Sequence, residues 1–411
     1  MPDVLIVGGG ASGLMAAVSA GRRGKSVLLL EQGDRAGRKL LITGKGRCNV
    51  TNNCGLDTLM ANILQNPRFL YSAFAAFSPQ DTMAFFEAAG VPLKTERGGR
   101  VFPVSDRAAD IADALLRECR KAGAQFAQGK AVSLILEDGR TAGVCCEDGT
   151  AYWARSVILC CGGCSYPVTG SDGSGWALAE QAGHSRTDIR PSLIPILTEE
   201  DDPREMMGLS LKNVTLTVAE GEREIFSELG EMLFTHFGVS GPLALSASAH
   251  MRTLGTKRAR PYQMRIDFKP GLTAEQLDKR LLRDFSGELN RDMIHSLGAL
   301  LPRKSIPVML RRAGIPFEVK VRDLTREQRR LLVGAIKGFT LTPKAFRPVA
   351  EAIVTAGGIP VKEVSPKTMA SKLSEGLYFA GEMLDVDAYT GGFNLQIAFS
   401  TGYLAGISAA D

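Results

Sequence analysis

The first thirty residues contain a predicted strand, three spaced glycines and a predicted helix, in that order. Val4–Val7 is a short apolar run, Gly8, Gly10 and Gly13 form the pattern G-x-G-x-x-G, and residues 14–21 have helical spacing. In such a unit the first glycine permits a tight turn, the second lets a pyrophosphate approach the backbone, and the third lets the helix pack closely on the strand. The order predicts a Rossmann unit that binds a dinucleotide at a helix N-terminus.

Glu31 narrows the choice of dinucleotide. A second predicted strand, residues 26–30, ends at this acid, which stands 23 residues after Gly8. A carboxylate about 20 residues after the first glycine accepts hydrogen bonds from ribose hydroxyls and repels a 2′-phosphate. NADP is therefore disfavoured in this cradle, and FAD and NAD stay open.

Two further segments favour FAD. The stretch GDRAGRKLLITGKGRCNVTN, residues 33–52, is too rich in Gly, Arg and Lys for the next helix, and its interleaved Gly44 and Gly46 predict a loop folded around phosphate. Residues 376–406 predict a short strand, a Gly-Glu pair, the glycines Gly391 and Gly392, and an amphipathic helix whose N-terminus faces the flavin. Two cradles at opposite ends of the chain suit one long ligand such as FAD.

Four segments resemble a known family. GRKLLITGKGRCNVTN, GRVFPVSDRA, MLFTHFGVSGP and FAGEMLDVDAYTGGFNLQIAFSTGYLAG are similar to the HI0933-like (BaiN-type) flavoproteins, which are NAD(P)/FAD-dependent oxidoreductases, and matching segments extend along the whole chain. The resemblance implies an α/β fold: a Rossmann-like FAD-binding domain of the two-dinucleotide-binding-domain type, with an inserted antiparallel β domain that itself carries a small helical domain.

The resemblance also implies a set of contacts to non-covalently bound FAD. The implied residues are Gly8, Gly10, Ser12, Gly13, Glu31, Arg38, Lys39, Gly44, Arg47, Asn49, Gly381, Glu382, Gly392, Asn394, Leu395 and Gln396. We expect further cofactor contacts at Ala11, Gln32, Cys48, Val132, Gly162 and Phe393.

Sequence patterns predict three domains. The FAD-binding domain comprises residues 1–191 and 353–411, the β-rich domain 192–271 and 338–352, and the helical domain 272–337. Alternating runs such as LKNVTLTVAEG predict antiparallel strands, and TAEQLDKRLLRDFS opens with a Thr-x-x-Gln capping box. Because ligand sites favour domain junctions, we expect the inserted domains to cover the flavin.

The segment GSDGSGWALAEQAG, residues 170–183, imitates a second nucleotide fingerprint. A true fingerprint directly follows a strand, whereas the residues before this segment include Pro167 and make a poor central strand. With no second Rossmann unit, NAD(P)H must reach the flavin transiently as an electron donor.

The cysteines raise a thiol–disulfide alternative. Cys161 and Cys164 form a C-x-x-C pattern, but Cys161 ends a predicted strand instead of opening a helix whose dipole would lower its pKa. Cys48 and Cys54 have five residues between them, where disulfide reductases have four. Buried apolar cysteines are the favoured interpretation, and no metal site is predicted.

Composition bears on partners and compartment. The net charge is only +5, without long Lys/Arg runs and with two Trp, so a nucleic-acid partner is not expected. No apolar stretch reaches the roughly 20 residues of a membrane span, so no membrane partner is expected either. Eight cysteines in 411 residues do not form a disulfide scaffold, and we expect a cytoplasmic protein. The oligomeric state stays open.

Three side chains are candidates for catalysis. His236 is a candidate proton donor, Tyr389 a hydrogen-bond donor to a substrate carbonyl, and Arg100 a clamp for a carboxylate or enolate. The predicted activity is NAD(P)H-driven reduction of an activated C=C bond in a small organic substrate. The alternatives are a flavin-dependent dehydrogenase or oxidase, a thiol–disulfide oxidoreductase, and a non-catalytic flavin module directed at RNA or protein. The sequence leaves the substrate, and the choice of NADH or NADPH, open.

Overall fold

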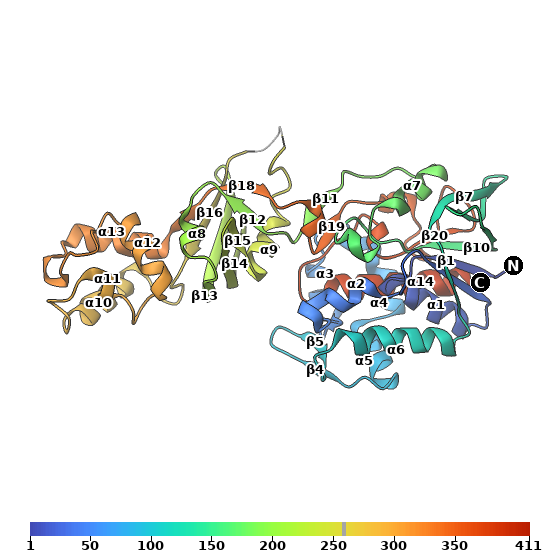
Figure 1. The fold of residues 1–411 in the computed structure, drawn as a ribbon, viewed down its shortest axis with the longest axis horizontal. Coiled ribbons are helices and arrows are strands. Elements are labelled where there is room, and N and C mark those ends of the chain that lie inside the picture. Colours follow the sequence, from blue (N-terminus) through green and yellow to red (C-terminus); the bar gives the residue numbers. More distant parts are fainter. Residues whose placement is uncertain (257–259) are drawn as a thin grey trace. The chain divides into compact units, whose positions relative to one another are not determined.

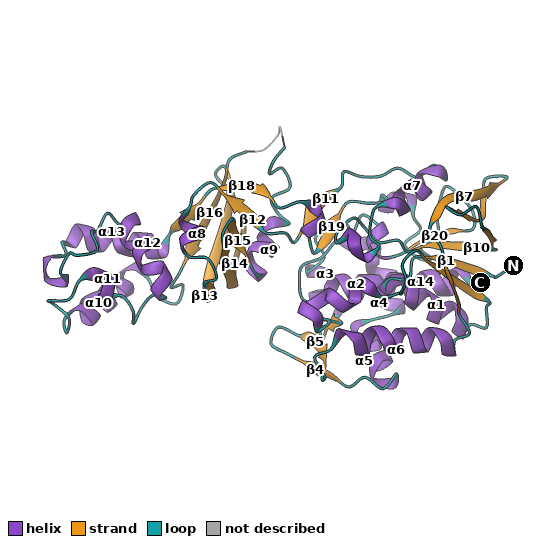
Figure 2. Ribbon diagram, viewed as in Figure 1, coloured by secondary structure: helices purple, strands orange, loops and turns teal. Residues whose placement is uncertain are grey.

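The computed structural model describes residues 1–256 and 260–411 and divides into two compact units (Figures 1 and 2). Met1–Ser192 with Val349–Asp411 form one, here called the Rossmann unit, and Leu193–Pro348 form the other, called the inserted unit. Residues 257–259, which fall within the expected β domain, lie outside the described residues. Each unit has its own hydrophobic core.

The Rossmann unit is built on a five-stranded parallel sheet. Its strand order is β20 (Leu377–Phe379), β10 (Ser156–Leu159), β1 (Val4–Val7), β2 (Val27–Glu31) and β6 (Gln125–Gln128). The inner strands β10, β1 and β2 are nearly continuous apolar runs, as is typical of parallel strands that are buried on both faces, whereas the edge strand β6 contains two glutamines. The register pairs Val7 with both Leu30 and Leu159, so the carboxyl ends of these strands meet at one edge. This arrangement confirms the predicted Rossmann-like fold.

The first and last helices of the chain pack against each other. Helix α1 (Ala11–Arg22) follows the glycine loop, and α14 (Phe393–Ala409) lies along it. A Cβ on Gly402 would lie 2.2 Å from the Ser12 carbonyl oxygen, so the two backbones approach as closely as glycine allows. The amphipathic pattern predicted for α14 is wrong: most of its residues are buried, because α1 and α4 (Tyr71–Ala76) both pack on it.

Smaller elements complete the Rossmann unit. They include the sheets β3 (Thr51–Asn52), β5 (Arg100–Pro103), β4 (Leu93–Thr95); β7 (Ala131–Glu137), β8 (Arg140–Cys146), β9 (Ala151–Trp153); and β11 (Arg190–Ser192), β19 (Val354–Ala356). The helices are α2 (Arg38–Ile42), α3 (Leu56–Ala61), α5 (Pro79–Ala88), α6 (Ala108–Lys121) and α7 (Ser174–Gln181). The 3-10 turn Pro167–Thr169 precedes α7, so the imitation fingerprint does not directly follow a strand.

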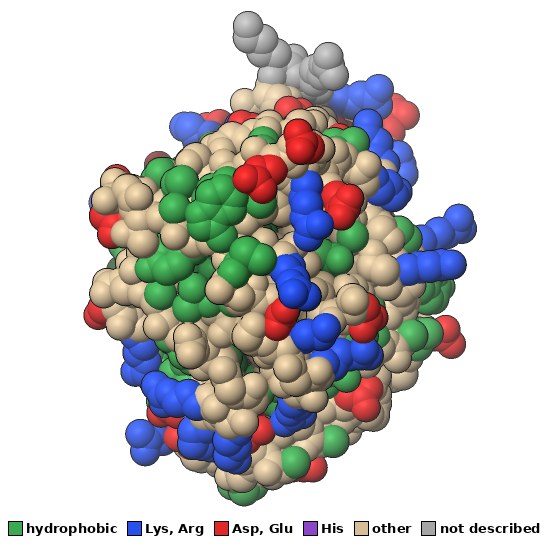
Figure 3. All heavy atoms as spheres, turned by 90° about the vertical axis from the view of Figure 1, so that its right-hand side faces the viewer, with side chains coloured by type: hydrophobic (Ala, Val, Ile, Leu, Met, Phe, Trp, Pro, Cys, Tyr) green, Lys and Arg blue, Asp and Glu red, His purple; other side chains and the backbone are tan. Residues whose placement is uncertain are grey.

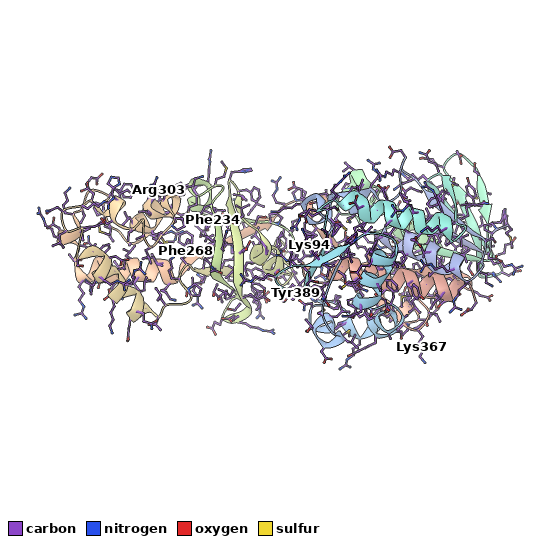
Figure 4. The ribbon with its side chains drawn as sticks, turned by 90° about the horizontal axis from the view of Figure 1, so that it is seen from below. Lys94, Phe234, Phe268, Arg303, Lys367 and Tyr389 are labelled. Carbon is purple, nitrogen blue, oxygen red and sulfur yellow. The ribbon has the colours of Figure 1, made fainter. Side chains whose placement is uncertain are left out.

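The inserted unit contains a seven-stranded antiparallel sheet. Its order is β17 (Phe339–Leu341), β16 (Tyr262–Asp267), β13 (Ser210–Glu220), β14 (Arg223–Thr235), β15 (Gly238–Ser240), β12 (Ile196–Thr198) and β18 (Pro343–Phe346). Phe234 on β14 and Phe268 after β16 lie near each other in Figure 4, with ring centroids 6.3 Å apart. They help to build this unit's core.

Helices accompany this sheet: α8 (Asp202–Glu205), α9 (Pro242–Ser248), α10 (Ala274–Phe285), α11 (Met293–Ser296), α12 (Ile306–Arg312) and α13 (Arg326–Lys337). The predicted capping box is present at the start of α10, between Thr273 and Gln276, and α13 repeats it with Thr325 and Gln328. Among the described residues, no helix is both long and apolar enough to cross a membrane.

Candidate functional site

The three glycines after β1 have the environments that a dinucleotide cradle requires. Gly8 has a φ of +102°, and a Cβ there would lie 2.6 Å from the Cys160 carbonyl oxygen. A Cβ on Gly13 would lie 1.9 Å from the Gly8 carbonyl oxygen, so helix α1 sits directly on the turn. Gly10 differs, because a Cβ there would meet nothing within 4 Å. Its backbone is therefore open to a ligand at the start of α1.

Glu31 lies at the end of β2, beside this loop. Its Oε2 accepts a hydrogen bond from the Gly9 N–H at 2.7 Å, and its Oε1 accepts one from the Gly33 N–H at 2.8 Å. A carboxylate has about four acceptor positions, so it can still accept ribose hydroxyls. The neighbouring Gln32 donates from Nε2 to the Gly170 carbonyl oxygen at 2.6 Å.

The loop after α2 has an unusual backbone. Gly44, Lys45 and Gly46 have φ values of 55°, 58° and 82°, and the buried Cys48 has a φ of 58°. The left-handed conformation costs a non-glycine residue roughly 1–2 kcal/mol. Such strain concentrates at functional sites, where it presents successive N–H groups to a ligand.

Asn49 supports the assignment of this loop to FAD. Its Oδ1 is buried and has no hydrogen-bond partner among the described residues. A buried acceptor requires a donor, and FAD offers a ring N–H and ribityl hydroxyls. The open Gly10 backbone, Glu31 and Asn49 together fit FAD.

Lys39 and Glu382 join the two ends of the chain. Lys39 Nζ lies 2.8 Å from Glu382 Oε2 and donates to Ser165 Oγ at 2.7 Å. Glu382 Oε1 accepts from the Thr355 N–H at 2.7 Å. Burial alone would raise the pKa of Glu382, but Lys39 and the hydrogen-bond donors outweigh it and hold that pKa below its usual value. Glu382 is thus a fixed negative charge beside the glycine loop that follows β10.

Four of the five basic side chains in residues 33–52, here called the flavin loop, form ion pairs with acids. Arg47 forms ion pairs with Glu96 and Asp106 and lies 4.1 Å over the Phe102 ring. It therefore anchors the loop to the β4–β5 hairpin, and a direct contact of its guanidinium with FAD stays a prediction. Arg38 lies 3.5 Å from Asp34 on the surface.

The glycine pair before α14 is clamped by β3. Gly391 and Gly392 have φ values of 123° and 97°. A Cβ on Gly392 would lie 2.3 Å from the Thr51 carbonyl oxygen, and Asn52 Nδ2 donates to the Gly391 carbonyl oxygen at 3.1 Å. The segment that carries Asn49 is thus held against the positive end of α14.

Two polar residues at the start of α14 form hydrogen bonds within the protein. Asn394 accepts from the Ala388 N–H at 3.0 Å and donates to the Ala388 carbonyl oxygen at 2.8 Å. Gln396 is buried and bonds to Thr51, Thr82, Phe77 and Ser400. These side chains shape the turn, and their direct contact with FAD stays a prediction, as it does for the buried Phe393 and the partly buried Leu395.

Most of the remaining predicted cofactor residues lie in segments that follow strands of the parallel sheet. Ala11 and Ser12 open α1, and a Cβ on Gly381 would lie 2.6 Å from Ser12 Oγ. Gly162 has a φ of 76° in the loop after β10. Val132 lies on β7 and is 44% exposed.

The candidate catalytic residues divide between the units. Tyr389 lies in the Rossmann unit, and Asn394 Nδ2 donates to its carbonyl oxygen at 3.2 Å. Arg100 is exposed on β5 and donates to the Arg97 carbonyl oxygen at 3.1 Å. His236 is exposed in the turn between β14 and β15 of the inserted unit. The structure does not bring the three together within one unit.

The thiols of Cys48 and Cys161 are poor nucleophiles. Burial raises the pKa of Cys48 and of Cys161 to about 12. Thiol–disulfide exchange requires thiolate at working pH, so this alternative gains no support.

Sequence reasoning missed several partners of the predicted residues. Ser165 and Thr355 bond to Glu382, and Asn52 and Thr51 contact the Gly391–Gly392 turn. Asn52 belongs to the quoted GRCNVTN segment, whereas no local pattern marks Ser165 or Thr355. Arg190, whose Nε is buried without a hydrogen-bond partner among the described residues, was also missed.

Comparison with known proteins identifies relatives along the whole chain. The model of the HI0933-like protein Rossmann domain matches residues 2–408. The 3-dehydro-bile acid delta(4,6)-reductase of Clostridium scindens is 33% identical over 413 residues and covers 100% of both chains. The ribosomal RNA dihydrouridine synthase of Haemophilus influenzae is 31% identical over 410 residues, 98% of this chain and 97% of its own. Because of the latter name, the expectation that nucleic acid is not a partner has no support.

Solved structures share the fold. The 3-ketosteroid-delta4-(5alpha)-dehydrogenase of Rhodococcus jostii RHA1 aligns with a TM-score of 0.55 at 16% identity, over 100% of this chain and 97% of its own. The 3-ketosteroid delta1-dehydrogenase of Sterolibacterium denitrificans also has a TM-score of 0.55, at 15% identity, over 100% and 99% of the two chains. These structures show the fold alone, whereas the whole-chain match to the family model and the 33% identical relative show that the chain belongs to the HI0933-like family of FAD-dependent oxidoreductases.

Proposed function

We propose that this protein reduces a C=C bond conjugated to a carbonyl group in a small organic substrate, with NAD(P)H as the electron donor. One hydride and one proton add across the double bond, and one NAD(P)H is oxidised to NAD(P)⁺. Bound FAD supplies the centre that accepts and passes on the hydride. The protein contributes orientation, charge and a proton.

The names of the two relatives support this reaction class. One is a delta(4,6)-reductase of a 3-dehydro-bile acid, and the other forms dihydrouridine. Each name describes hydrogen added to a ring double bond that can be conjugated to a carbonyl. We extend that common chemistry to this chain.

The observation that carries the proposal is the arrangement at the start of α14. Thr51 and Asn52 contact the Gly391–Gly392 turn. They follow Asn49 by two and three residues, and the buried Oδ1 of Asn49 has no hydrogen-bond partner among the described residues. The N-terminus of this helix presents a positive partial charge, which stabilises negative charge on a reduced ring system. Such a site favours hydride chemistry over thiol chemistry.

Tyr389 is our preferred proton donor within the Rossmann unit. It lies two residues before Gly391, and the Asn394 side chain fixes its backbone. We retain His236 and Arg100 as further candidates for proton donation and for binding of a substrate oxygen. The described residues contain no second nucleotide-binding fingerprint for NADH or NADPH. We therefore propose that the nicotinamide binds next to the flavin only transiently.

A second candidate substrate is a uridine in RNA. The inserted unit has 25 Lys and Arg against 19 Asp and Glu, a net charge of +6, whereas the Rossmann unit has a net charge of −1. A polyanion binds favourably to such a unit. On the Rossmann unit, the face shown in Figure 3 has basic and acidic side chains interspersed.

An anaerobic flavin titration tests the proposal. We expect NADH or NADPH to bleach the visible flavin band, and a 3-oxo-4-ene steroid or 2-cyclohexenone to restore it with formation of the saturated ketone. Restoration by unmodified ribosomal RNA, with dihydrouridine detected by nucleoside mass spectrometry, would select the second candidate. If neither NADH nor NADPH bleaches the flavin band, the result contradicts both candidate reactions.

A further inference from the structure

Arg190 differs from the ion-paired arginines of the Rossmann unit. Its Nε is buried and has no hydrogen-bond partner among the described residues, although the residue as a whole is only partly buried. Eight arginines of this unit pair instead with a carboxylate: Arg22, Arg23, Arg35, Arg38, Arg47, Arg140, Arg155 and Arg186. A buried charged donor without an acceptor costs stability, and such groups cluster at functional sites. Arg190 Nε therefore needs an acceptor that the described residues do not supply.

Strand pairing places Arg190 at the edge of the candidate flavin site. In the β11–β19 ladder Arg190 pairs with Ala356, and Pro191 with Thr355. Thr355 Oγ1 accepts from the Cys164 N–H at 2.9 Å, and its own N–H donates to Glu382 at 2.7 Å. Cys164 follows β10 and Glu382 follows β20, so β11 borders the carboxyl edge of the parallel sheet. Ligands of such sheets bind at that edge.

The face of β11 that carries Arg190 points to the segment before the glycine pair. Alternation along a strand puts Arg190 and Ser192 on one face, opposite Pro191. Ser192 Oγ donates to Asp387 Oδ2 at 2.7 Å, and Asp387 lies two residues before Tyr389. Arg190 thus shares a face with a residue bound to the segment that carries the preferred proton donor.

The chemistry of a guanidinium indicates the ligand. It is always charged and offers planar N–H donors that match an oxygen anion. When a hydride adds to the β-carbon of a conjugated carbonyl compound, the C=C electrons move toward the carbonyl and its oxygen becomes an enolate oxygen. We infer that Arg190 binds this oxygen and stabilises its developing charge. This inference rests on the proposed reaction.

A phenolate titration tests the binding without turnover. 4-Hydroxybenzaldehyde presents a phenolate oxygen in place of the enolate oxygen, and a phenolate stacked on oxidised flavin gives a long-wavelength charge-transfer band. We expect the FAD-loaded wild type to show this band, Arg190→Met to weaken the phenolate at least tenfold, and Arg190→Lys to recover part of the affinity. Arg186→Met is the matched control, because Arg186 lies on the same segment but pairs with Glu180.

Three results would overturn the inference. They are the same phenolate affinity in Arg190→Met and wild type, no band in the wild type, or loss of FAD from Arg190→Met and Arg190→Lys at an unchanged melting temperature. The last result would assign Arg190 to the cofactor phosphates. Failure of the proposed reaction gives a different signature, because neither nicotinamide would then bleach the wild type while the phenolate difference between variants persisted.

Discussion

Lys39 and Glu382 lie 343 residues apart in the chain, yet their charged groups are only 2.8 Å apart. The pair connects α2, at the flavin loop, to the turn after β20. The ion pair thereby connects the N-terminal segment of the predicted FAD site to its C-terminal segment.

Lys39→Met should destabilise the protein because it leaves the Glu382 carboxylate without its cation. We expect the free energy of unfolding to fall by about 1–3 kcal/mol. Glu382→Gln should cost less in the Lys39→Met background than in the wild type, since the two groups are coupled. Urea denaturation of both single variants and the double variant measures this coupling, and additive effects would disprove it.

The same pair predicts sensitivity to acid. The pKa of Glu382 is below its usual value of 4.5 in the folded state, so the unfolded chain binds a proton first as the pH falls. Stability from this group is present above about pH 4.5 and is lost as the pH falls through the folded pKa. Unfolding midpoints from pH 6 to pH 3 should drop less steeply in Glu382→Gln than in the wild type.

His184 gives a second pH dependence in a higher range. Its ring is fully buried, 3.1 Å from Glu363 and 2.7 Å from Ser371 Oγ, and burial lowers its pKa below 6.5 despite Glu363. The unfolded state then binds the proton first, so stability falls as the pH drops below 6.5. Between pH 8 and pH 5.5, the unfolding midpoint of His184→Gln should depend less on pH than the midpoint of the wild type. The exposed His295→Gln serves as the control and should keep the wild-type slope.

Two alanine substitutions should separate cofactor binding from folding. Gly10→Ala adds a methyl group where nothing lies within 4 Å, so the protein should fold and lose affinity for FAD. Gly13→Ala puts a methyl group 1.9 Å from a backbone oxygen and should cost about 3 kcal/mol or more. Circular dichroism melting and the FAD content per chain distinguish the two effects. A Gly10→Ala protein with full FAD content would contradict the assignment of this loop to the cofactor.

Cys161→Ser should leave nicotinamide-driven flavin reduction unchanged within about twofold. The thiol pKa of about 12 keeps Cys161 protonated at neutral pH, so it cannot act as a nucleophile. Stopped-flow reduction of the wild type and the variant checks this prediction. A large loss of rate at unchanged FAD content would revive the thiol alternative.

The local sequence pattern was sufficient to predict the backbone of the glycine loop after β1. Strand, glycines, helix and Glu31 are neighbours in the sequence, so their spacing alone predicts the parallel β1–β2 pair and the turn between β1 and α1. The capping box of α10 was visible for the same reason. Such features depend on contacts within a few tens of residues.

Features that depend on distant partners could not be predicted. The ion pairs of Arg47 with Glu96 and Asp106 are an example, because these acids reach it only after the β4–β5 hairpin forms. Helix α14 was predicted to be amphipathic. In the fold, Gly402 and Gly406 instead admit the backbone of α1.

The packing of α14 on α1 also sets an order of events during synthesis. Strand β20 and helix α14, which belong to the Rossmann unit, emerge from the ribosome after Leu193–Pro348, whose buried residues form their own core and whose described strands form their own sheet. The inserted unit can therefore reach its native state while the first 192 residues still await their final helix. Asp411, which follows α14, then pairs with Arg23 directly after α1.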